Sequence, residues 1–302
     1  MRFVRQLALL WIVALPVGAF TAPERPEITG IALVRLRASN MDASRAFYAK
    51  TLGLTQASKG CFSPAKTATC FIVNSIQQLE LVPADPADSK DGVEAIGYHV
   101  RDARVMREYL LARGVKCSEV KRSDSGDQYV EVQDPEDHRL LLLSPGNGTM
   151  SSVAISPLSN QIIHAGFVVR DRAAEDAFYR DILGFRLYWH GGMKDDETNW
   201  VAMEVPNGTN WLEYMLHVSP SADHHTLGVM NHISLGVVDI KAADARLIKN
   251  GWKPTEDPKL GRDGKWQLNL YDPDDTRVEY MEFKPAQKPC CSEFTGPHPG
   301  PQ

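Results

Sequence analysis

The sequence predicts an α+β fold built from four βαβββ units that pair into two similar domains. Two features lead to this prediction: segments of the first half recur in the second, and each recurring segment joins an apolar strand to an amphipathic helix. The length of 302 residues fits about two domains. Residues 147–160, rich in Ser, Gly and Pro, are expected to link the two halves.

The internal repeat is visible in two pairs of segments. DASRAFYAKTLGL at 42–54 recurs as AAEDAFYRDILGF at 173–185, and VRDARVMREYLLARGVK at 100–116 recurs as VVDIKAADARLIKNGWK at 237–253. Each half therefore contains two units. Because a single unit leaves one face of its sheet exposed, we expect the two units of each half to pair around a common core.

Each unit begins with an apolar strand, continues with a helix whose apolar residues lie three and four apart, and ends with three short strands. In the last unit we expect the final two strands near 266–271 and 277–283, on either side of an Asp-Pro-Asp-Asp turn. Glycines stand where the four helices should end, in the place of a left-handed cap residue: Gly53, Gly114, Gly184 and Gly251.

These patterns place one domain at residues 28–146 and a second at 161–284. Residues 285–302 are rich in Pro and Gly and predict a tail without fixed structure. Residues 1–22 have the layout of a secretory signal peptide, with basic residues before a short apolar run and small residues after it. The sequence thus predicts an exported protein, periplasmic or secreted, that keeps no membrane contact after cleavage.

Composition narrows the class of partner. Hydrophobic residues make up 43% of the chain and charged residues 24%, as in ordinary globular proteins. The formal net charge is −5 and no block of Lys and Arg stands out, which argues against nucleic acid or an anionic membrane as the main partner. Cys61 and Cys70 could form a disulfide across neighbouring strands in an oxidising compartment.

The second half carries one His and one Glu at equivalent places in each of its units. His164 lies in the opening strand and Glu213 in the closing strand of the third unit, and His232 and Glu279 take the same places in the fourth. Alone, each would be read as a hydrogen-bonded core or rim residue. Together, on strand faces that are otherwise apolar or small, they predict a site for one divalent metal: Zn, Ni, Co, Mn or Fe(II).

The βαβββ repeats, the FYxxxLG motif and this His/Glu–His/Glu set resemble the vicinal oxygen chelate superfamily. It includes glyoxalase I, extradiol dioxygenases, methylmalonyl-CoA epimerase, and the bleomycin and fosfomycin resistance proteins. The resemblance covers about residues 28–284 and implies two glyoxalase-like domains. The first is degenerate, because Leu33, Ala95 and Leu141 stand at three ligand positions and only Glu80 keeps its place. That half is expected to serve as structure, as a lid, or as the surface of a homodimer.

The resemblance implies a metal-dependent enzyme that holds a small substrate by adjacent oxygens. A glyoxalase-I-like lyase or isomerase is the first hypothesis, with Glu213 or Glu279 leaving the metal to act as general base. An extradiol-type Fe(II) dioxygenase is the alternative, although Asn269 and residues 259–262 stand where that resemblance expects a Tyr and a His. A non-catalytic binding protein of the bleomycin resistance type is the third hypothesis, which the retained His/Glu set disfavours.

Strand alternation predicts which other side chains line the substrate cavity. The expected lining residues are His190, Trp211, Gln267, Asn269 and Tyr271. Trp189 and Trp200 could extend an aromatic wall beside Trp211. The Gly-Gly that follows His190 suggests a mobile loop at the mouth, which makes His190 a candidate second base.

Overall fold

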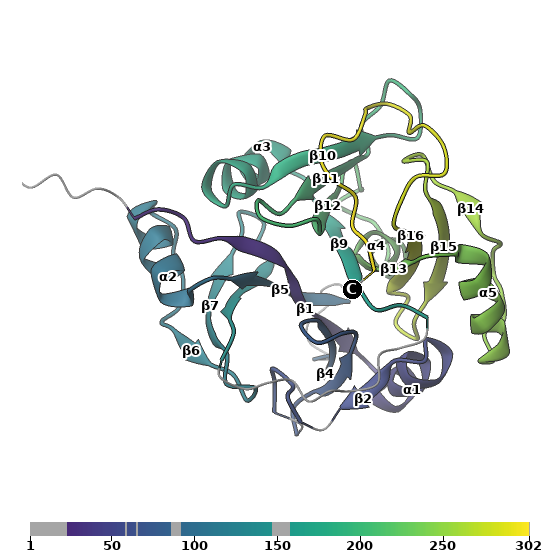
Figure 1. The fold of residues 1–302 in the computed structure, drawn as a ribbon, viewed down its shortest axis with the longest axis horizontal. Helices are drawn as coiled ribbons and strands as arrows, with labels where there is room; N and C mark the ends of the chain where they lie inside the picture. Colours follow the sequence, from purple (N-terminus) through teal and green to yellow (C-terminus); the bar gives the residue numbers. More distant parts are fainter. Residues whose placement is uncertain (1–22, 58, 65, 86–91, 147–157, 302) are drawn as a thin grey trace, which may run out of the picture.

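A computed structural model describes residues 23–57, 59–64, 66–85, 92–146 and 158–301. The chain forms two eight-stranded sheets, one from each half, which lie side by side in Figure 1. The expected signal peptide, residues 1–22, lies outside the described residues, as does most of the linker. Among the residues that are described, none of the helices has the length and apolar character needed to cross a bilayer.

The first half contains the first two units. Its elements are β1 (Ile28–Ala38), α1 (Met41–Ala46), the π-helix η1 (Phe47–Thr51), β2 (Thr55–Ala57), β3 (Thr69–Ile72), β4 (Gln78–Pro83), β5 (Val93–Val100), α2 (Ala103–Ala112), β6 (Lys121–Arg122), β7 (Gln128–Gln133) and β8 (Arg139–Ser144). The strand order is β2-β3-β4-β1-β5-β8-β7-β6. The two units therefore join through the antiparallel pair of their opening strands, β1 and β5.

The second half repeats this plan. Its elements are β9 (Ile162–Val168), α3 (Arg172–Asp176), the π-helix η2 (Ala177–Ile182), β10 (Arg186–Gly191), β11 (Trp200–Glu204), β12 (Trp211–Met215), α4 (His224–Met230), β13 (His232–Val237), α5 (Ile240–Lys249), β14 (Lys259–Leu260), β15 (Trp266–Tyr271) and β16 (Arg277–Glu282). The order β10-β11-β12-β9-β13-β16-β15-β14 matches the first sheet strand for strand. The four predicted βαβββ units are confirmed, and the short helix α4 is an addition.

Local sequence signals set the ends of the helices. Asp or Asn side chains accept hydrogen bonds from the first-turn amides of α1, α2, α3, α4 and α5. The four glycines expected after the helices all have positive φ, between 69° at Gly53 and 98° at Gly251. This is the left-handed conformation that only glycine adopts without strain.

The two halves share one large apolar core that draws side chains from both sheets. Two reciprocal hydrogen bonds cross the boundary. Tyr48 of η1 donates its hydroxyl proton to Asp272, after β15, at 3.0 Å, and Tyr179 of η2 donates to Asp134, after β7, at 3.1 Å. The Phe-Tyr motif of each half is therefore anchored on the other half.

The opposite face of each sheet carries a smaller apolar cluster of its own. In the first half this cluster contains Leu33, Ala95 and Leu141, the three residues that replace His or Glu. Glu80 is fully buried beside them, where its carboxylate accepts hydrogen bonds from Arg35 at 3.1 Å and from the Ser63 amide at 2.7 Å. The interior of the first half is thus occupied by apolar side chains and an ion pair.

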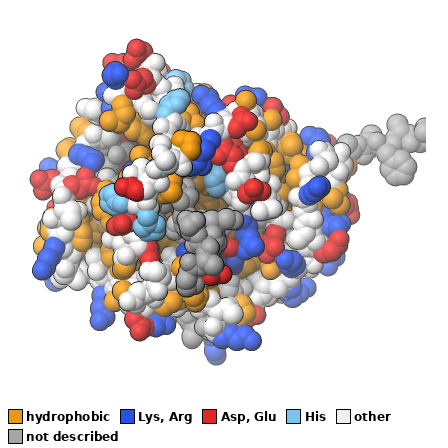
Figure 2. Space-filling model, turned by 180° about the vertical axis from the view of Figure 1, so that it is seen from behind, with side chains coloured by type: hydrophobic (Ala, Val, Ile, Leu, Met, Phe, Trp, Pro, Cys, Tyr) orange, Lys and Arg blue, Asp and Glu red, His pale blue; other side chains and the backbone are white. Residues whose placement is uncertain are grey.

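Two disulfides occur in the described chain. Cys61 pairs with Cys70, as the sequence allowed, although Cys61 lies in the loop before β3 and not on a strand. Cys290 pairs with its neighbour Cys291 near the C-terminus, and Cys117 is free. On the face shown in Figure 2, acidic and basic side chains are interspersed and neither sign forms a continuous patch.

Candidate metal centre

Four adjacent strands in the middle of the second sheet, β12, β9, β13 and β16, each supply one candidate ligand. His164 lies on β9 opposite Trp211 of β12, which places Glu213 two residues further along the parallel neighbour. Ser234 of β13 is paired with both His164 and Glu279, and it lies two residues after His232. Residues two apart on a strand share a face, so this register puts all four side chains on the same side of the sheet.

The four side chains meet at one point. His164 Nε2 lies 3.0 Å from His232 Nε2, 3.2 Å from Glu279 Oε2 and 3.8 Å from Glu213 Oε2. His232 Nε2 lies 3.1 Å from Glu213 Oε2. Ligand atoms of His164, Glu213 and His232 all lie within 4.8 Å of one another, and Glu279 joins the group through His164. Both imidazoles are fully buried.

These spacings fit a bound metal ion. Two ligand atoms that each lie about 2.1 Å from one ion are separated by roughly 3.0 Å at right angles and roughly 3.4 Å at a tetrahedral angle. The contacts of 3.0, 3.1 and 3.2 Å fall in or next to this range. Two imidazoles and two carboxylates are also a donor set that Zn, Ni, Co, Mn and Fe(II) accept.

The imidazole of His232 is held in the orientation that coordination requires. Its Nδ1 lies 3.0 Å from the carbonyl oxygen of Met230, so the proton on Nδ1 is donated there and Nε2 keeps a free lone pair. Gly166 provides space for the ring, because a Cβ at that position would lie 2.3 Å from His232 Cε1. His164 stacks on Trp211, with ring centres 4.7 Å apart.

The electrostatics favour the ligand forms of these groups. Burial alone would raise the pKa of Glu279, but the hydrogen bond from His164 and the charge of Arg277 lower it to about 2. At Glu213 burial also opposes ionisation, yet hydrogen bonding to His232 and the charge of His164 lower its pKa overall. Burial and Arg277 lower the pKa of His232. Ionised carboxylates and a neutral imidazole are the forms that bind a metal.

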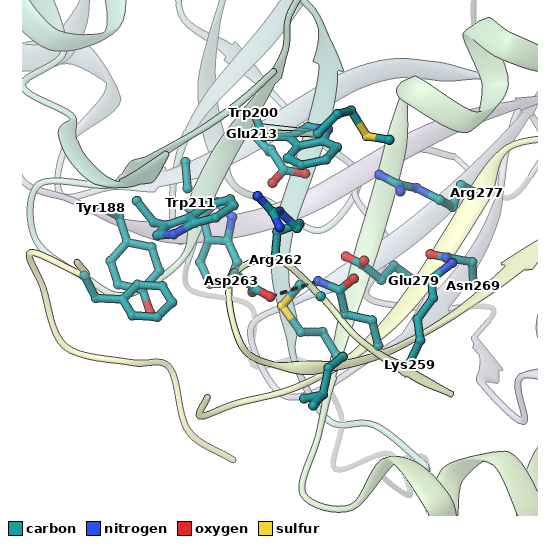
Figure 3. Close-up of a pocket in the computed structure, with 18 residues that line it drawn as sticks. Tyr188, Trp200, Trp211, Glu213, Lys259, Arg262, Asp263, Asn269, Arg277 and Glu279 are labelled. Atoms are coloured by element: carbon teal, nitrogen blue, oxygen red, sulfur yellow. Dashed lines mark hydrogen bonds between the residues drawn. The ribbon is translucent and has the colours of Figure 1, made fainter. Parts of the chain in front are cut away.

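A cavity of about 330 Å³ opens above the cluster, large enough for a small organic molecule (Figure 3). Its lining includes Glu213 and Glu279 from the cluster, apolar side chains, and the basic residues Lys259, Arg262 and Arg277. The apolar lining consists of Tyr188, Trp189, Met193, Trp200, Ala202, Trp211, Leu260, Met281 and Phe294.

Three of the five expected lining residues, Trp211, Gln267 and Asn269, line the cavity, and so do Trp189 and Trp200. His190 does not, because it pairs with Val201, whose side chain belongs to the core on the other face of the sheet. A shift in register between Leu187 and Trp189 breaks the alternation of β10, so that Tyr188 and Trp189 both pack in the cluster on the cavity side.

Tyr271 also falls outside the lining. It is paired with Arg277 and so lies on the cavity face, but at the end of β15, where its ring is 6.0 Å from that of His225. Alternation identifies the face of a residue and not its position along the cavity. The same rule applied to β16 would have found Arg277, which lies two residues before Glu279.

The C-terminal segment, for which the sequence predicts no fixed structure, makes defined contacts beside the cavity. We call residues 285–298 the strap; it contains no helix or strand. It begins at the turn between β14 and β15, where the Ala286 amide donates to Gly264 O at 2.8 Å and the Cys290 amide donates to Arg262 O at 2.9 Å. The strap then crosses to the opposite edge strand, β10, as the yellow segment of Figure 1 shows.

At β10 the strap satisfies polar groups and fills apolar space. The Trp189 indole donates to Cys290 O at 3.2 Å, and the His190 amide donates to the Ser292 hydroxyl at 2.9 Å. Phe294 packs against the cavity-side cluster and lines the cavity itself. These contacts join residues about a hundred positions apart and follow no periodic pattern, so the sequence carried no signal for them.

A sequence profile of the Glyoxalase/Bleomycin resistance protein/Dioxygenase superfamily matches residues 30–142 and 161–280, one match in each half and together most of the chain. The chain belongs to this superfamily. Each match falls on one of the two sheets, which agrees with the duplicated fold of this superfamily member. No curated protein sequence matches this chain at a significant level.

Solved structures with the same fold include a variant of homoprotocatechuate 2,3-dioxygenase from B. fuscum in complex with HPCA. It has a TM-score of 0.65 and 16% identity, covering 86% of this chain and 72% of that one. Another variant of that dioxygenase has a TM-score of 0.66 and 16% identity, and the match covers 91% of this chain and 74% of that one. The anaerobic complex of the Brevibacterium fuscum enzyme with 3,4-dihydroxyphenylacetate has a TM-score of 0.60 and 16% identity, and the match covers 86% of this chain and 82% of that one. At this identity the likeness establishes the fold.

Proposed function

We propose that the second half of this superfamily member is a divalent-metal-dependent active site that moves a proton beside a carbonyl of a small substrate, as a glyoxalase-I-like lyase or isomerase does. The observation that carries the proposal is the convergence of His164, Glu213, His232 and Glu279 at the base of a cavity. A divalent ion bound there would supply Lewis-acid chemistry to adjacent oxygens of the substrate.

Glu213 is the residue best placed to carry the proton. Its side chain is 14% exposed and lines the cavity, whereas that of Glu279 is 5% exposed. Glu213 Oε2 is held by His232 at 3.1 Å but lies 3.8 Å from His164. A carboxylate in this position can turn toward a substrate carbon, accept its proton and deliver it to the neighbouring carbon. Glu279 stays ionised beside Arg277 as the fixed member of the pair.

An extradiol-type Fe(II) dioxygenase is the second candidate. It is favoured by the likeness in fold to homoprotocatechuate 2,3-dioxygenase, over 86 to 91% of this chain. His164, His232 and Glu279 would then form a facial triad. Two observations place this candidate second: Asn269 lines the cavity where a Tyr was expected, and Glu213 adds a second carboxylate to the cluster.

Metal content is the first test of the proposal. Wild-type protein should contain about one divalent ion per chain by mass spectrometry, and His232→Ala should lose most of it. His225→Ala, which removes a histidine that is 62% exposed on α4, is the matched control and should retain the ion. A wild-type protein that binds no divalent ion would leave only a small-molecule binding function.

Reaction class is the second test. For proton transfer, wild-type protein in D₂O should exchange the carbon-bound hydrogen beside the carbonyl of a small substrate, followed by NMR. Glu213→Gln should lose this exchange and keep the metal. Oxygen uptake with catechols, together with bound iron and no hydrogen exchange, would instead support the dioxygenase.

We also propose that the protein works outside the cytoplasm. The layout of residues 1–22 supports export, and the Cys61–Cys70 pair suits an oxidising compartment. Cell fractionation and N-terminal sequencing of the mature protein test this. A cytoplasmic protein that keeps Met1 would contradict it.

A further inference from the structure

Arg277 enters the cavity from the same strand as Glu279. It is the first residue of β16, lies two residues before Glu279 on the same face, and lines the cavity. Figure 3 shows its guanidinium group extending into the cavity near Glu279 and Asn269. Any substrate that reaches the cluster therefore passes next to this cation.

Arg277 differs from Arg262 and Lys259, the other basic residues that line the cavity, in having no salt bridge or hydrogen bond to its side chain among the described residues. Arg262 donates to Gly192 O at 3.1 Å and pairs with Asp195, and Lys259 pairs with Glu256 at 2.5 Å. Within the described ranges, Arg277 takes part in no salt bridge, and its Nε is buried without a hydrogen-bond acceptor. A buried donor of a charged group that stays unpaired is costly, so a site that keeps one calls for an acceptor from elsewhere.

The charges at the base of the cavity call for one more anion. A divalent ion bound there would be neutralised by Glu213 and Glu279, which would leave the positive charge of Arg277 without a counter-charge of its own. Asp263 and Lys265 lie close to each other, carry opposite charges and add no net excess when both are ionised. A bound molecule with a single negative group would therefore complete the balance, whereas a neutral one would leave Arg277 unpaired.

The rest of the cavity fits a flat apolar body. It is lined by Tyr188, Trp189, Trp200, Trp211 and, from the strap, Phe294. Aromatic side chains in this number favour stacking or edge contacts with a ring. Asn269 adds a polar group to this lining: among the described residues its buried Oδ1 has no hydrogen-bond partner, and it lies next to Glu279, where a substrate hydroxyl could bind it.

We propose that the substrate is a small aromatic monocarboxylate: Arg277 binds its carboxylate, the aromatic wall holds its ring, and its adjacent oxygens face the His/Glu cluster. Only the contact between the adjacent oxygens and the His/Glu cluster rests on the proposed function. The pairing of Arg277 with a carboxylate is argued from the residues that line the cavity.

A pair of probes of similar shape, one with a carboxylate and one with a neutral group in its place, tests the proposal. We choose 3,4-dihydroxyphenylacetate and its neutral amide, titrated calorimetrically into metal-loaded protein. Wild-type protein should prefer the acid by about tenfold or more, the scale of one charge-assisted pair. Arg277→Gln should remove this preference and leave affinity for the amide within about twofold. Arg277→Lys should keep part of the preference for the acid, because lysine retains the positive charge but cannot donate two parallel hydrogen bonds to the carboxylate.

Two controls separate this inference from the proposed function. Arg246→Gln, an exposed arginine on α5, makes the same chemical change outside the cavity and should keep the preference for the acid. Metal content and melting temperature are measured for every variant, so that loss of metal or of folding is seen separately. If wild-type protein holds no metal but still prefers the acid through Arg277, the inference stands and the metal-dependent function fails. Equal binding of acid and amide by wild-type protein, or no binding of either, would overturn the inference.

Discussion

The imidazole of His232 lies directly against the backbone of Gly166 on the neighbouring strand, where a Cβ would come within 2.3 Å of its Cε1. The close approach is possible only because Gly166 has no side chain, and the two residues are paired across β9 and β13. Gly166→Ala should therefore push the ring away from the cluster and reduce metal content by about tenfold or more, since displaced ligands weaken metal sites strongly.

Metal analysis of the purified variant checks this expectation, together with its melting temperature. Gly300→Ala is the matched control, because nothing lies within 4 Å of a Cβ there. Full metal content in Gly166→Ala would show that His232 is not needed where the structure places it.

The reciprocal hydrogen bonds between the halves should contribute to stability in equal measure. Tyr179→Phe removes a hydroxyl that donates to the buried carboxylate of Asp134, and Tyr48→Phe removes the equivalent donor to Asp272. Each change should lower the free energy of unfolding by about 1–3 kcal/mol, as expected for a buried hydrogen bond to a charged group. The two changes should be additive, because the pairs share no partner.

Urea denaturation of the single and double variants measures both effects. Tyr129→Phe is a control, since its ring packs against Phe62 but its hydroxyl has no hydrogen-bond partner in the described chain. Two separate unfolding transitions, with only one of them shifted by each variant, would show that the halves unfold independently in spite of these bonds.

The repeat explains how much of this architecture could be predicted. Equivalent positions in duplicated units implied equivalent strands, and for this reason His164 and His232 could be matched to Glu213 and Glu279 without coordinates. Leu33, in the degenerate half, was identified by the same comparison. Such inferences depend on local periodicity and on the symmetry between units, both of which the sequence contains.

Features that arise from breaks in periodicity or from distant contacts could not be predicted. The shift in register on β10 left Tyr188 on the cavity side but turned His190, two residues later, away from it. Phe294 reached the cavity through a strap that has no repeating pattern. Alternation places Arg277 on the correct face of its strand. Its lack of a salt bridge among the described residues depends on which acidic side chains lie nearby in space, and Asp195 and Glu256 pair with Arg262 and Lys259 instead.

Removal of the strap should open the cavity. A chain ending at Lys288 lacks Cys290, which accepts the indole hydrogen bond of Trp189, and Phe294, which packs beside Trp211. Acrylamide should then quench tryptophan fluorescence more strongly, and the amides of β10 should exchange hydrogen faster. Removal of residues 299–302 alone is the control, because it keeps His298, whose Nδ1 lies 2.5 Å from the Tyr188 hydroxyl. Unchanged quenching in the longer truncation would mean that the strap does not cover these rings in solution.

Glu175 should make the protein less stable as the pH rises. Its side chain is fully buried, and burial together with the charge of Asp134 raises its pKa to about 9. The folded protein thus keeps a proton that the unfolded chain releases near its ordinary pKa of 4.5, so stability falls as the pH rises between these two values.

The variant Glu175→Gln keeps an acceptor for the Glu136 amide and removes the loss of stability that comes from protonating Glu175. Calorimetry should show the variant melting several degrees above wild type near pH 8, with a difference that shrinks toward about pH 5. The control Glu108→Gln, at an exposed position of α2, should have the same melting temperature as wild type across this pH range. A difference that stays constant across this range, or grows as the pH falls, would show that Glu175 is not protonated in the folded protein.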